Sequence, residues 1–414
     1  MKKFLCVVGI LFLIFCGLLI YNEKIFHISA LEIEEETMEI DSLYIYGRRL
    51  NIEGEYNLSE NADLVLYNGE FISYPINIKD NRFNLSEYVN DGLYLDVINN
   101  GKYYMFIRTK YLDGDVEKYR YYGIENTTEY KETLYYTMSN YDKRIIIKSD
   151  DRYKTLVMNV SNNRNKDVYD IVIDPGHGGR DPGACRYDYC ETDFTMDISL
   201  KLKEILEGAG IRVKLTYEQG QLDENTKLNE YGVHGRAVIP KEVNAKYVFS
   251  IHLNSGKDQN VNGFEIYAPN NANYDFAKYI ADNIVAATGS QYSNNTKNKV
   301  LDGVYSRSFT DKDISDALKD YQSNKLNPYV ITNNTNYYYM IRETGGIITG
   351  AYVDNRNEKI LENPYVKTNV GVESYILELG FLSNKKDLNN IINNKTKYIE
   401  AIANSIKELY FNNY

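Results

Sequence analysis

Apolar and polar positions divide the chain into stretches of different periodicity. The first stretch, residues 1–30, holds an uninterrupted apolar run from Phe4 to Tyr21 that follows two lysines. As a helix this run would be about 27 Å long, which is enough to cross the hydrocarbon core of a membrane. The pattern therefore predicts one N-terminal transmembrane helix, with the lysines in the cytoplasm and the rest of the chain on the outer face.

Two other interpretations of this stretch stay open. A cleaved signal peptide would give a secreted or cell-wall protein, although the apolar run is long for one and Ile28-Ser29-Ala30 is a poor cleavage site. Residues 13–16 have weak similarity to a lipoprotein site, but the bulky Phe15 precedes Cys16. In every case we expect the remaining residues to be exported.

Residues 31–160 alternate with the period of β-strands. Short runs rich in β-branched and aromatic residues are separated by Asn-Gly and Asp-Gly turn signals. These runs begin at Leu43, Ala62, Gly92, Lys102 and Arg144. Because no helical period lies between them, the pattern predicts an all-β sandwich-like domain. Its tyrosines are compatible with a glycan-binding module and equally with a spacer, so its role stays open.

Residues 161–168 are polar and without periodicity, which predicts a linker. From residue 169 to residue 414, strand and helix patterns alternate. The expected strands are 169–174, 211–216, 246–252, 263–267 and 374–379, and the expected helices are 191–207, 274–288 and the last twenty-odd residues. In the first helix, one face carries Phe194, Ile198, Leu202 and Ile205. This alternation predicts an α/β domain with a largely parallel sheet flanked by helices.

Composition and charge exclude some classes of partner. A hydrophobic content of 43% and a charged content of 25% are typical of a globular protein. The net charge of -11 argues against nucleic acid, whose phosphates require a basic surface. It also argues against adhesion to anionic lipid through a basic patch. Membrane contact is therefore expected through the N-terminal helix alone.

Polar side chains stand at the ends of three predicted strands. His177 follows the first strand, His252 ends the third and Glu378 lies near the end of the last, while Glu191 opens the first helix. Ligands of open α/β sheets bind where strand ends converge, so these four side chains can meet. Two imidazoles and one carboxylate, with a position left for water, suit a catalytic zinc site. A carboxylate such as Glu378 within an apolar strand is costly unless it is paired or functional.

Other side chains compete for these roles. His234 is an alternative imidazole, but it lies in a Gly-flanked loop with no strand to fix it. The alternative carboxylates to Glu191 are Asp174, Asp181 and Asp188, of which Asp174 also suits a cap of the Pro-Gly turn.

Two cysteines, Cys185 and Cys190, lie just before Glu191. Outside the cell they could form a disulfide, which would stiffen the loop that carries Glu191. Free thiols and a soft-metal site are the alternatives.

At this point the residues resemble a known family. The segments VIDPGHGGRDPGA, SIHLNS and ILELGFLSN, together with Glu191, are similar to the motifs of zinc-dependent N-acetylmuramoyl-L-alanine amidases of the amidase-3 type. The resemblance runs from residue 169 to the C-terminus. It implies that His177, Glu191 and His252 bind Zn²⁺, that Glu378 is the catalytic glutamate, and that peptidoglycan is cleaved between N-acetylmuramic acid and L-alanine. The residues by themselves indicate only export and a metal hydrolase site.

The resemblance also implies substrate contacts. Arg236 is similar to the family's arginine ahead of the second histidine, and Asn254 lies within the second-histidine motif. Arg342 is a candidate for a substrate carboxylate, with a surface ion pair as the alternative. The chain departs from the family at Pro240-Lys241, where an Ala-Asn pair is usual, so the contacts of that loop are in doubt. Two other functions stay open, namely an inactive cell-wall-binding protein and a zinc peptidase acting on the peptide stem.

Overall fold

The computed structural model describes residue 28 and, with gaps, fifteen further parts of the chain: 31–47, 49–58, 61–79, 81–85, 93–95, 97–126, 134–136, 143–162, 168–218, 220–222, 235–270, 272, 274–323, 331–345 and 372–411. The predicted transmembrane helix and His234 lie outside the described residues. Within the described ranges, no helix is both long and apolar enough to span a bilayer.

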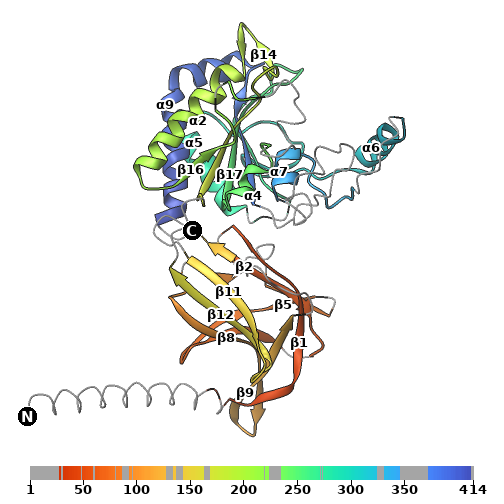
Figure 1. Ribbon diagram of the computed structural model, residues 1–414. Coiled ribbons are helices and arrows are strands. Elements are labelled where there is room, and N and C mark those ends of the chain that lie inside the picture. The colour runs from red at the N-terminus through yellow and green to blue at the C-terminus, as the bar shows by residue number, and fades with distance from the viewer. Residues whose placement is uncertain are drawn as a thin grey trace, which may run out of the picture. The chain divides into compact units, whose positions relative to one another are not determined.

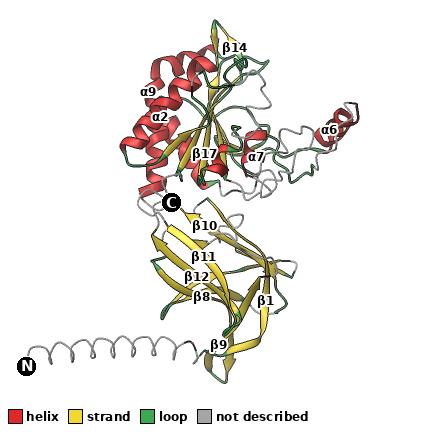
Figure 2. Ribbon diagram, in the orientation of Figure 1, coloured by secondary structure: helices red, strands yellow, loops and turns green. Residues whose placement is uncertain are grey.

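The chain separates into two compact units. Unit 1 comprises Met1–Tyr44, Arg49–Leu134 and Lys143–Asn162, and unit 2 comprises Ile45–Arg48, Tyr135–Asp142 and Asn163–Tyr414. Unit 1 is built from strands, and unit 2 combines a sheet with helices (Figure 1, Figure 2).

The strands of the first part of the chain form one 12-stranded sheet within the described residues. Their bounds are β1 Ile33–Tyr46, β2 Arg49–Glu55, β3 Ala62–Tyr67, β4 Phe71–Pro75, β5 Asn77–Lys79, β6 Arg82–Leu85, β7 Leu93–Tyr94, β8 Gly101–Asp113, β9 Val116–Asn126, β10 Leu134–Tyr136, β11 Lys143–Asp150 and β12 Thr155–Asn162. The sequence led us to expect two packed sheets. Hydrogen bonding is instead continuous, because the long strand β1 lies between β9 and β2 and joins the two groups of strands.

The alternation that predicted these strands is visible in their burial. In β11, Lys143, Ile145 and Ile147 are buried while Arg144 and Lys148 are exposed, which is the period of two of a half-buried strand. The Asp-Gly signal at residue 113 is also confirmed, since β8 and β9 pair as an antiparallel hairpin whose last rung joins Asp113 and Val116.

Unit 2 contains a 7-stranded sheet in the order β16-β13-β17-β21-β18-β20-β19. The bounds are β13 Ile171–Pro175, β16 Val213–Leu215, β17 Tyr247–Asn254, β18 Glu265–Tyr267, β19 Lys299–Leu301, β20 Val304–Tyr305 and β21 Glu373–Phe381. From β16 to β21 the pairs are parallel, and β18 then runs antiparallel to β21. The inner strands β13, β17 and β21 are almost entirely buried apolar runs, as expected of strands covered on both faces.

The described residues of unit 2 also contain helices. They are α2 Thr192–Gly208, α4 Ile239–Glu242, α5 Asp275–Thr288, α6 Asp311–Ser323, α7 Tyr339–Gly345 and α9 Lys385–Phe411. Figure 1 shows α2, α5 and α9 grouped on one side of the sheet. Helix α2 buries Phe194, Ile198, Leu202 and Leu206. Ile205, which we expected on that face, is only partly buried, because Leu206 completes the i, i+4 spacing from Leu202.

Candidate metal centre

Three parallel strands deliver the polar side chains to one edge of the sheet. β13 and β17 are in register from Ile171 opposite Tyr247 to Pro175 opposite Ile251. On the other side of β17, His252 lies opposite Glu378 of β21. His177 is the second residue after β13 and lies in the left-handed region at φ 61°. Parallel strands end at the same edge, so side chains separated by two hundred residues become neighbours.

His177, Glu191 and His252 converge at this edge. One ligand atom from each lies within 4.8 Å of the other two. Nε2 of His177 is 2.9 Å from Oε2 of Glu191, and Nδ1 of His252 is 3.5 Å from Oε1 of the same carboxylate. The two imidazole rings are edge to face with centroids 4.9 Å apart. The side chain of Glu191 is only 6% exposed, whereas those of His177 and His252 are 25% and 17% exposed, so the site is open from the imidazole side.

Backbone and side-chain hydrogen bonds fix these groups. The Ala184 N–H donates to Oε2 of Glu191 at 2.8 Å, and the Leu253 N–H donates to Oε1 at 2.9 Å. Nδ1 of His177 lies 2.7 Å from Oδ2 of Asp181. Asp181, an alternative ligand in the sequence, therefore orients the imidazole of His177 and leaves Nε2 facing the site.

Two glycines make room for this arrangement. A Cβ on Gly176 would collide with the carbonyl of Ile251 and with the ring of His252. A Cβ on Gly183 would collide with the Glu191 carboxylate and the His177 ring, and Gly183 has φ +69°. The glycine-rich segment after β13 is thus required for close approach as well as for the turn.

The carboxylate and imidazole perturb each other's pKa. Burial alone would lower the pKa of His177, but hydrogen bonds and charge from Glu191 and Asp181 outweigh it and raise the pKa to about 9. Burial raises the pKa of Glu191, yet the hydrogen bonds from His177 and His252 outweigh it and hold that pKa far below its usual value. Without a metal, His177 and Glu191 therefore form an ion pair.

Glu378 sits beside this cluster on β21, opposite His252 on one side and Glu265 of β18 on the other. Burial, and then the charges of Glu191 and Glu265, raise the pKa of Glu378 well above its ordinary value. Its Oε2 atom is buried and accepts no hydrogen bond from any described residue. A carboxylate with a raised pKa and a vacant acceptor atom is suited to exchange protons with a substrate or water.

Glu265 was not among the site residues predicted from the sequence. This carboxylate is fully buried and accepts hydrogen bonds from Asn254 Nδ2 and the Tyr267 hydroxyl at 2.9 Å each, and from Asn295 Nδ2 at 3.1 Å. Three donors keep the carboxylate in place beside Glu378. Its signal was available, because Glu265 interrupts the apolar run Phe264 to Tyr267 as Glu378 interrupts its own strand.

Asp174 and Arg236 form a fully internal pair. The guanidinium donates to both carboxylate oxygens at 2.7 and 2.8 Å, and the hydroxyls of Ser250 and Thr216 donate to the same carboxylate. Asp174 has no exposed surface and Arg236 is 6% exposed. The structure thus places Asp174 away from the ligand cluster, and Arg236 points to Asp174 and to the carbonyl of Pro175.

The other candidate residues have protein partners as well. Asn254 donates to Glu265, and its Oδ1 accepts from the Ser255 N–H at 2.8 Å. Arg342 pairs with Glu343 at 2.8 Å and donates to the carbonyls of Asn336 and Tyr337. Asp188 lies in a turn between β14 Cys185–Arg186 and β15 Tyr189–Cys190, at φ 67°.

The donor set fits a zinc ion. Zinc in catalytic sites is held by three nitrogen or oxygen donors and keeps one position open. Such a set is supplied by His177, Glu191 and His252. A hydrogen bond to Asp181 holds the His177 ring, and hydrogen bonds from the Ala184 and Leu253 amides hold the Glu191 carboxylate. The acceptor atom of Glu378 completes a site that could both hold a metal and move a proton.

Comparison with known proteins identifies the family. Residues 171–408, more than half of the chain, match the family described as N-acetylmuramoyl-L-alanine amidase. A probable N-acetylmuramoyl-L-alanine amidase AmiB of Haemophilus influenzae is 25% identical over 251 residues, which cover 58% of this chain and 50% of that protein. The probable cell wall amidase LytH of Staphylococcus aureus is 33% identical over 100 residues, which cover 23% of this chain and 30% of that protein. The match therefore spans about half or less of these relatives.

A solved structure is also similar. The amidase AmiC2 of Nostoc punctiforme has 21% sequence identity and a TM-score of 0.37, with 59% of this chain and 98% of that chain covered. On the family match, this chain belongs to the N-acetylmuramoyl-L-alanine amidase family.

Proposed function

We propose that unit 2 is a zinc-dependent hydrolase that cleaves the amide between N-acetylmuramic acid and L-alanine in peptidoglycan. The observation that carries the proposal is the convergence of His177, Glu191 and His252 at one sheet edge, with Glu378 opposite His252. Family membership supports the choice of bond. The geometry supports the choice of chemistry, because three donors and a free carboxylate are what metal-assisted hydrolysis requires.

His177, Glu191 and His252 would hold the ion. When bound, zinc lowers the pKa of water and polarises a carbonyl group, which makes amide hydrolysis feasible at neutral pH. The role of this chain's own residues is to keep the donors in position. Asp181 holds the His177 ring by Nδ1, and the Ala184 and Leu253 amides hold both oxygens of Glu191.

Glu378 would act as the general base and then the general acid. Its carboxylate takes a proton from the attacking water and later gives the proton to the departing amine of L-alanine. The raised pKa suits this exchange, because a carboxyl group with an ordinary pKa of 4.5 is a weak base and a poor proton donor at neutral pH. Such a group contributes about 10² to 10⁴ in rate.

We also propose that the protein acts outside the cytoplasm, held at the outer face of the membrane by the N-terminal apolar segment or released after its cleavage. Peptidoglycan lies there, and the apolar run from Phe4 to Tyr21 supports export. Contact of Arg236, Asn254 and Arg342 with substrate stays a prediction.

Replacing Glu378 by Gln tests the function. The amide keeps the shape of the side chain but cannot accept the proton of water, so we expect turnover to fall by at least about 10²-fold while zinc stoichiometry is unchanged. The measurement is release of peptide from purified muropeptides, with identification of the new amino terminus and of the sugar product. Glu204→Gln, at an exposed position on α2, is the matched control and should retain full activity.

The products separate this function from its alternatives. A released peptide whose first residue is L-alanine with a free amino group supports the amidase function. A different terminal residue would indicate a peptidase of the stem, and no product from the wild-type protein with zinc present would indicate an inactive wall-binding protein. Wild-type activity in Glu378→Gln would remove Glu378 from the mechanism.

A further inference from the structure

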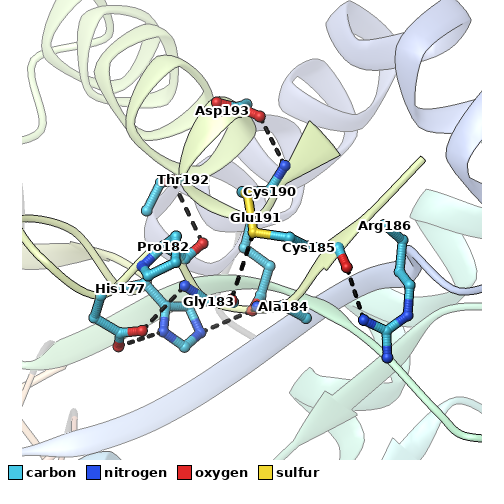
Figure 3. Close-up of a disulfide and its surroundings, with 11 residues drawn as sticks. His177, Pro182, Gly183, Ala184, Cys185, Arg186, Cys190, Glu191, Thr192 and Asp193 are labelled. Carbon is cyan, nitrogen blue, oxygen red and sulfur yellow. Dashed lines mark hydrogen bonds and ion pairs between the residues drawn. A yellow bond between two sulfur atoms is a disulfide. The ribbon is translucent and has the colours of Figure 1, made fainter. Parts of the chain in front are cut away.

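The loop between His177 and Glu191 contains a cross-linked hairpin. β14 and β15 pair antiparallel through Cys185 opposite Cys190 and Arg186 opposite Tyr189. The two cysteines form a disulfide, so of the three states that the sequence left open the structure has the cross-linked one. Figure 3 shows the disulfide near the Glu191 side chain, whose carboxylate is joined by a dashed line to the ring of His177.

The cross-link lies one rung from the metal-ligand candidate Glu191. The Glu191 N–H donates to the carbonyl of Ala184 at 3.1 Å, and the Ala184 N–H donates to Oε2 of Glu191 at 2.8 Å. Ala184 and Glu191 are therefore the pair next to Cys185 and Cys190. The strand that supplies the amide donor and the residue that receives it are tied together by the adjacent covalent bond.

The backbone conformation of the hairpin turn is unfavourable for the two residues that form it. Tyr187 and Asp188 have φ of 51° and 67°, the left-handed conformation of a two-residue hairpin loop. Such loops are usually Asn-Gly, because a left-handed conformation is unfavourable for a residue with a large side chain. A strained turn with only two rungs between β14 and β15 needs another source of stability, and the disulfide supplies it by limiting the open conformations of the loop.

The hairpin also contacts the segment after β21 and, through it, the segment after β17. The Tyr187 hydroxyl donates to the carbonyl of Ser383, after β21, at 3.1 Å, and the Lys385 ammonium lies 5.0 Å from the centre of the Tyr187 ring. Oγ of Ser383 in turn accepts from the Gly256 N–H, after β17, at 3.0 Å. One series of contacts thus joins the segments after β13, β17 and β21.

We propose that the Cys185–Cys190 disulfide is a positioning element for Glu191, and that the metal affinity of this chain depends on the disulfide being formed. It rests on the proposed function only in taking Glu191 as a metal ligand. In the reduced chain the strained turn is free to open, the Ala184 amide no longer fixes the carboxylate, and the Tyr187 contact with Ser383 is lost. The metal centre is then fully assembled only where disulfides form, outside the cytoplasm.

The test compares zinc binding by the full-length chain in its oxidised and reduced forms. A trialkylphosphine reduces the disulfide to two thiols. The phosphine is oxidised to the phosphine oxide with the oxygen of one water molecule, whose two hydrogens go to the thiols. The reagent is then removed in the absence of air. Zinc affinity is measured by competition with a chromogenic chelator. Loss of groups that orient metal ligands typically weakens metal binding by about 10- to 100-fold, and we expect a loss in this range.

Two variants complete the design. Cys185→Ser with Cys190→Ser should bind zinc like the reduced chain and should not respond to the phosphine, which excludes effects on other thiols. Tyr187→Phe keeps the disulfide and removes only the hydroxyl that reaches Ser383, so it should weaken zinc binding less than reduction does. Circular dichroism of each form checks that the rest of the domain stays folded.

The zinc affinities and the reaction products test the positioning role of the disulfide and the amidase function separately. Equal zinc affinity of the oxidised and reduced chains, within about twofold, would overturn the positioning role while leaving the amidase proposal intact. Disulfide-dependent zinc affinity in a chain that releases no L-alanine terminus would support the positioning role and overturn the amidase proposal.

Discussion

At the scale of single residues, His177 has carboxylates on both ring nitrogens, with Asp181 at Nδ1 and Glu191 at Nε2. The two acids act differently. Asp181 orients the ring through Nδ1, whereas Glu191 lies against Nε2, the nitrogen that would bind a metal together with Glu191. His177, His252 and Glu378 could be found from sequence since each is a polar side chain where an apolar run ends or is interrupted, and Glu191 could be found as the carboxylate that opens the first predicted helix. The partnership of Glu265 with Glu378 could not, because it depends on which strands pair.

The ion pair between His177 and Glu191 in the metal-free chain leads us to predict how zinc affinity depends on pH. Metal-free His177 keeps its proton up to about pH 9, so below that pH a metal must displace the proton. We expect apparent zinc affinity to rise by about tenfold per pH unit from this one proton and to level off above about pH 9. Isothermal titration calorimetry at a series of pH values up to and above pH 9 measures the apparent zinc affinity.

Asp181→Asn provides the control for that experiment. The substitution removes a carboxylate that raises the pKa of His177, so zinc affinity should level off at a lower pH. Zinc affinity that does not change between pH 6.5 and pH 9 would contradict the assignment of a protonated His177 in the metal-free chain.

At the scale of elements, the inner strands and main helices of unit 2 were predictable because each strand is a recognisable apolar run and each helix is long enough to show a helical period. β13, β17, β21, α2 and α5 lie within a few residues of the expected ranges. β14, β15 and β20 have two residues each, too few for any period to appear. The internal pair of Asp174 and Arg236 was also hidden, because these residues are 62 positions apart in the chain.

The Asp174–Arg236 pair should contribute a large part of the free energy of unfolding of this domain. Arg236→Leu leaves the fully buried Asp174 carboxylate without its charge partner, and such a change costs about 3–5 kcal/mol in the free energy of unfolding. Urea denaturation of the zinc-free protein measures the difference.

An exposed ion pair gives the comparison. Lys312 and Asp316 on α6 pair at the surface, so Lys312→Ala should change the free energy of unfolding by less than about 1 kcal/mol. If Arg236→Leu and Lys312→Ala had equal effects, the Asp174 pair would contribute no more than a surface contact.

At the scale of the whole molecule, each unit has a core of its own. A cluster that includes Val172, Val248, Tyr305, Ile341 and Ile376 is drawn from unit 2, and another of Val65, Phe106 and Tyr121 lies within unit 1. The strand order of these sheets was beyond prediction, because pairing between distant segments depends on the packing of the complete fold.

A fragment of residues 163–414 should therefore fold and act alone. Its core and all four site residues belong to unit 2, and we expect zinc affinity and activity on soluble muropeptides to match the full chain within about twofold. Cooperative thermal unfolding of the fragment is the first measurement. An unfolded fragment would show that Ile45–Arg48, Tyr135–Asp142 or unit 1 itself is required.

The place of β21 in the sheet has a consequence for biosynthesis. This strand lies between β17 and β18, yet it follows both by more than a hundred residues in the chain. Until β21 has been synthesised, β17 and β18 have no central neighbour to pair with, and Glu378 is absent. A chain that stops before residue 373 therefore lacks β21 and Glu378, so we expect it to have neither the complete sheet of unit 2 nor the proposed hydrolytic activity.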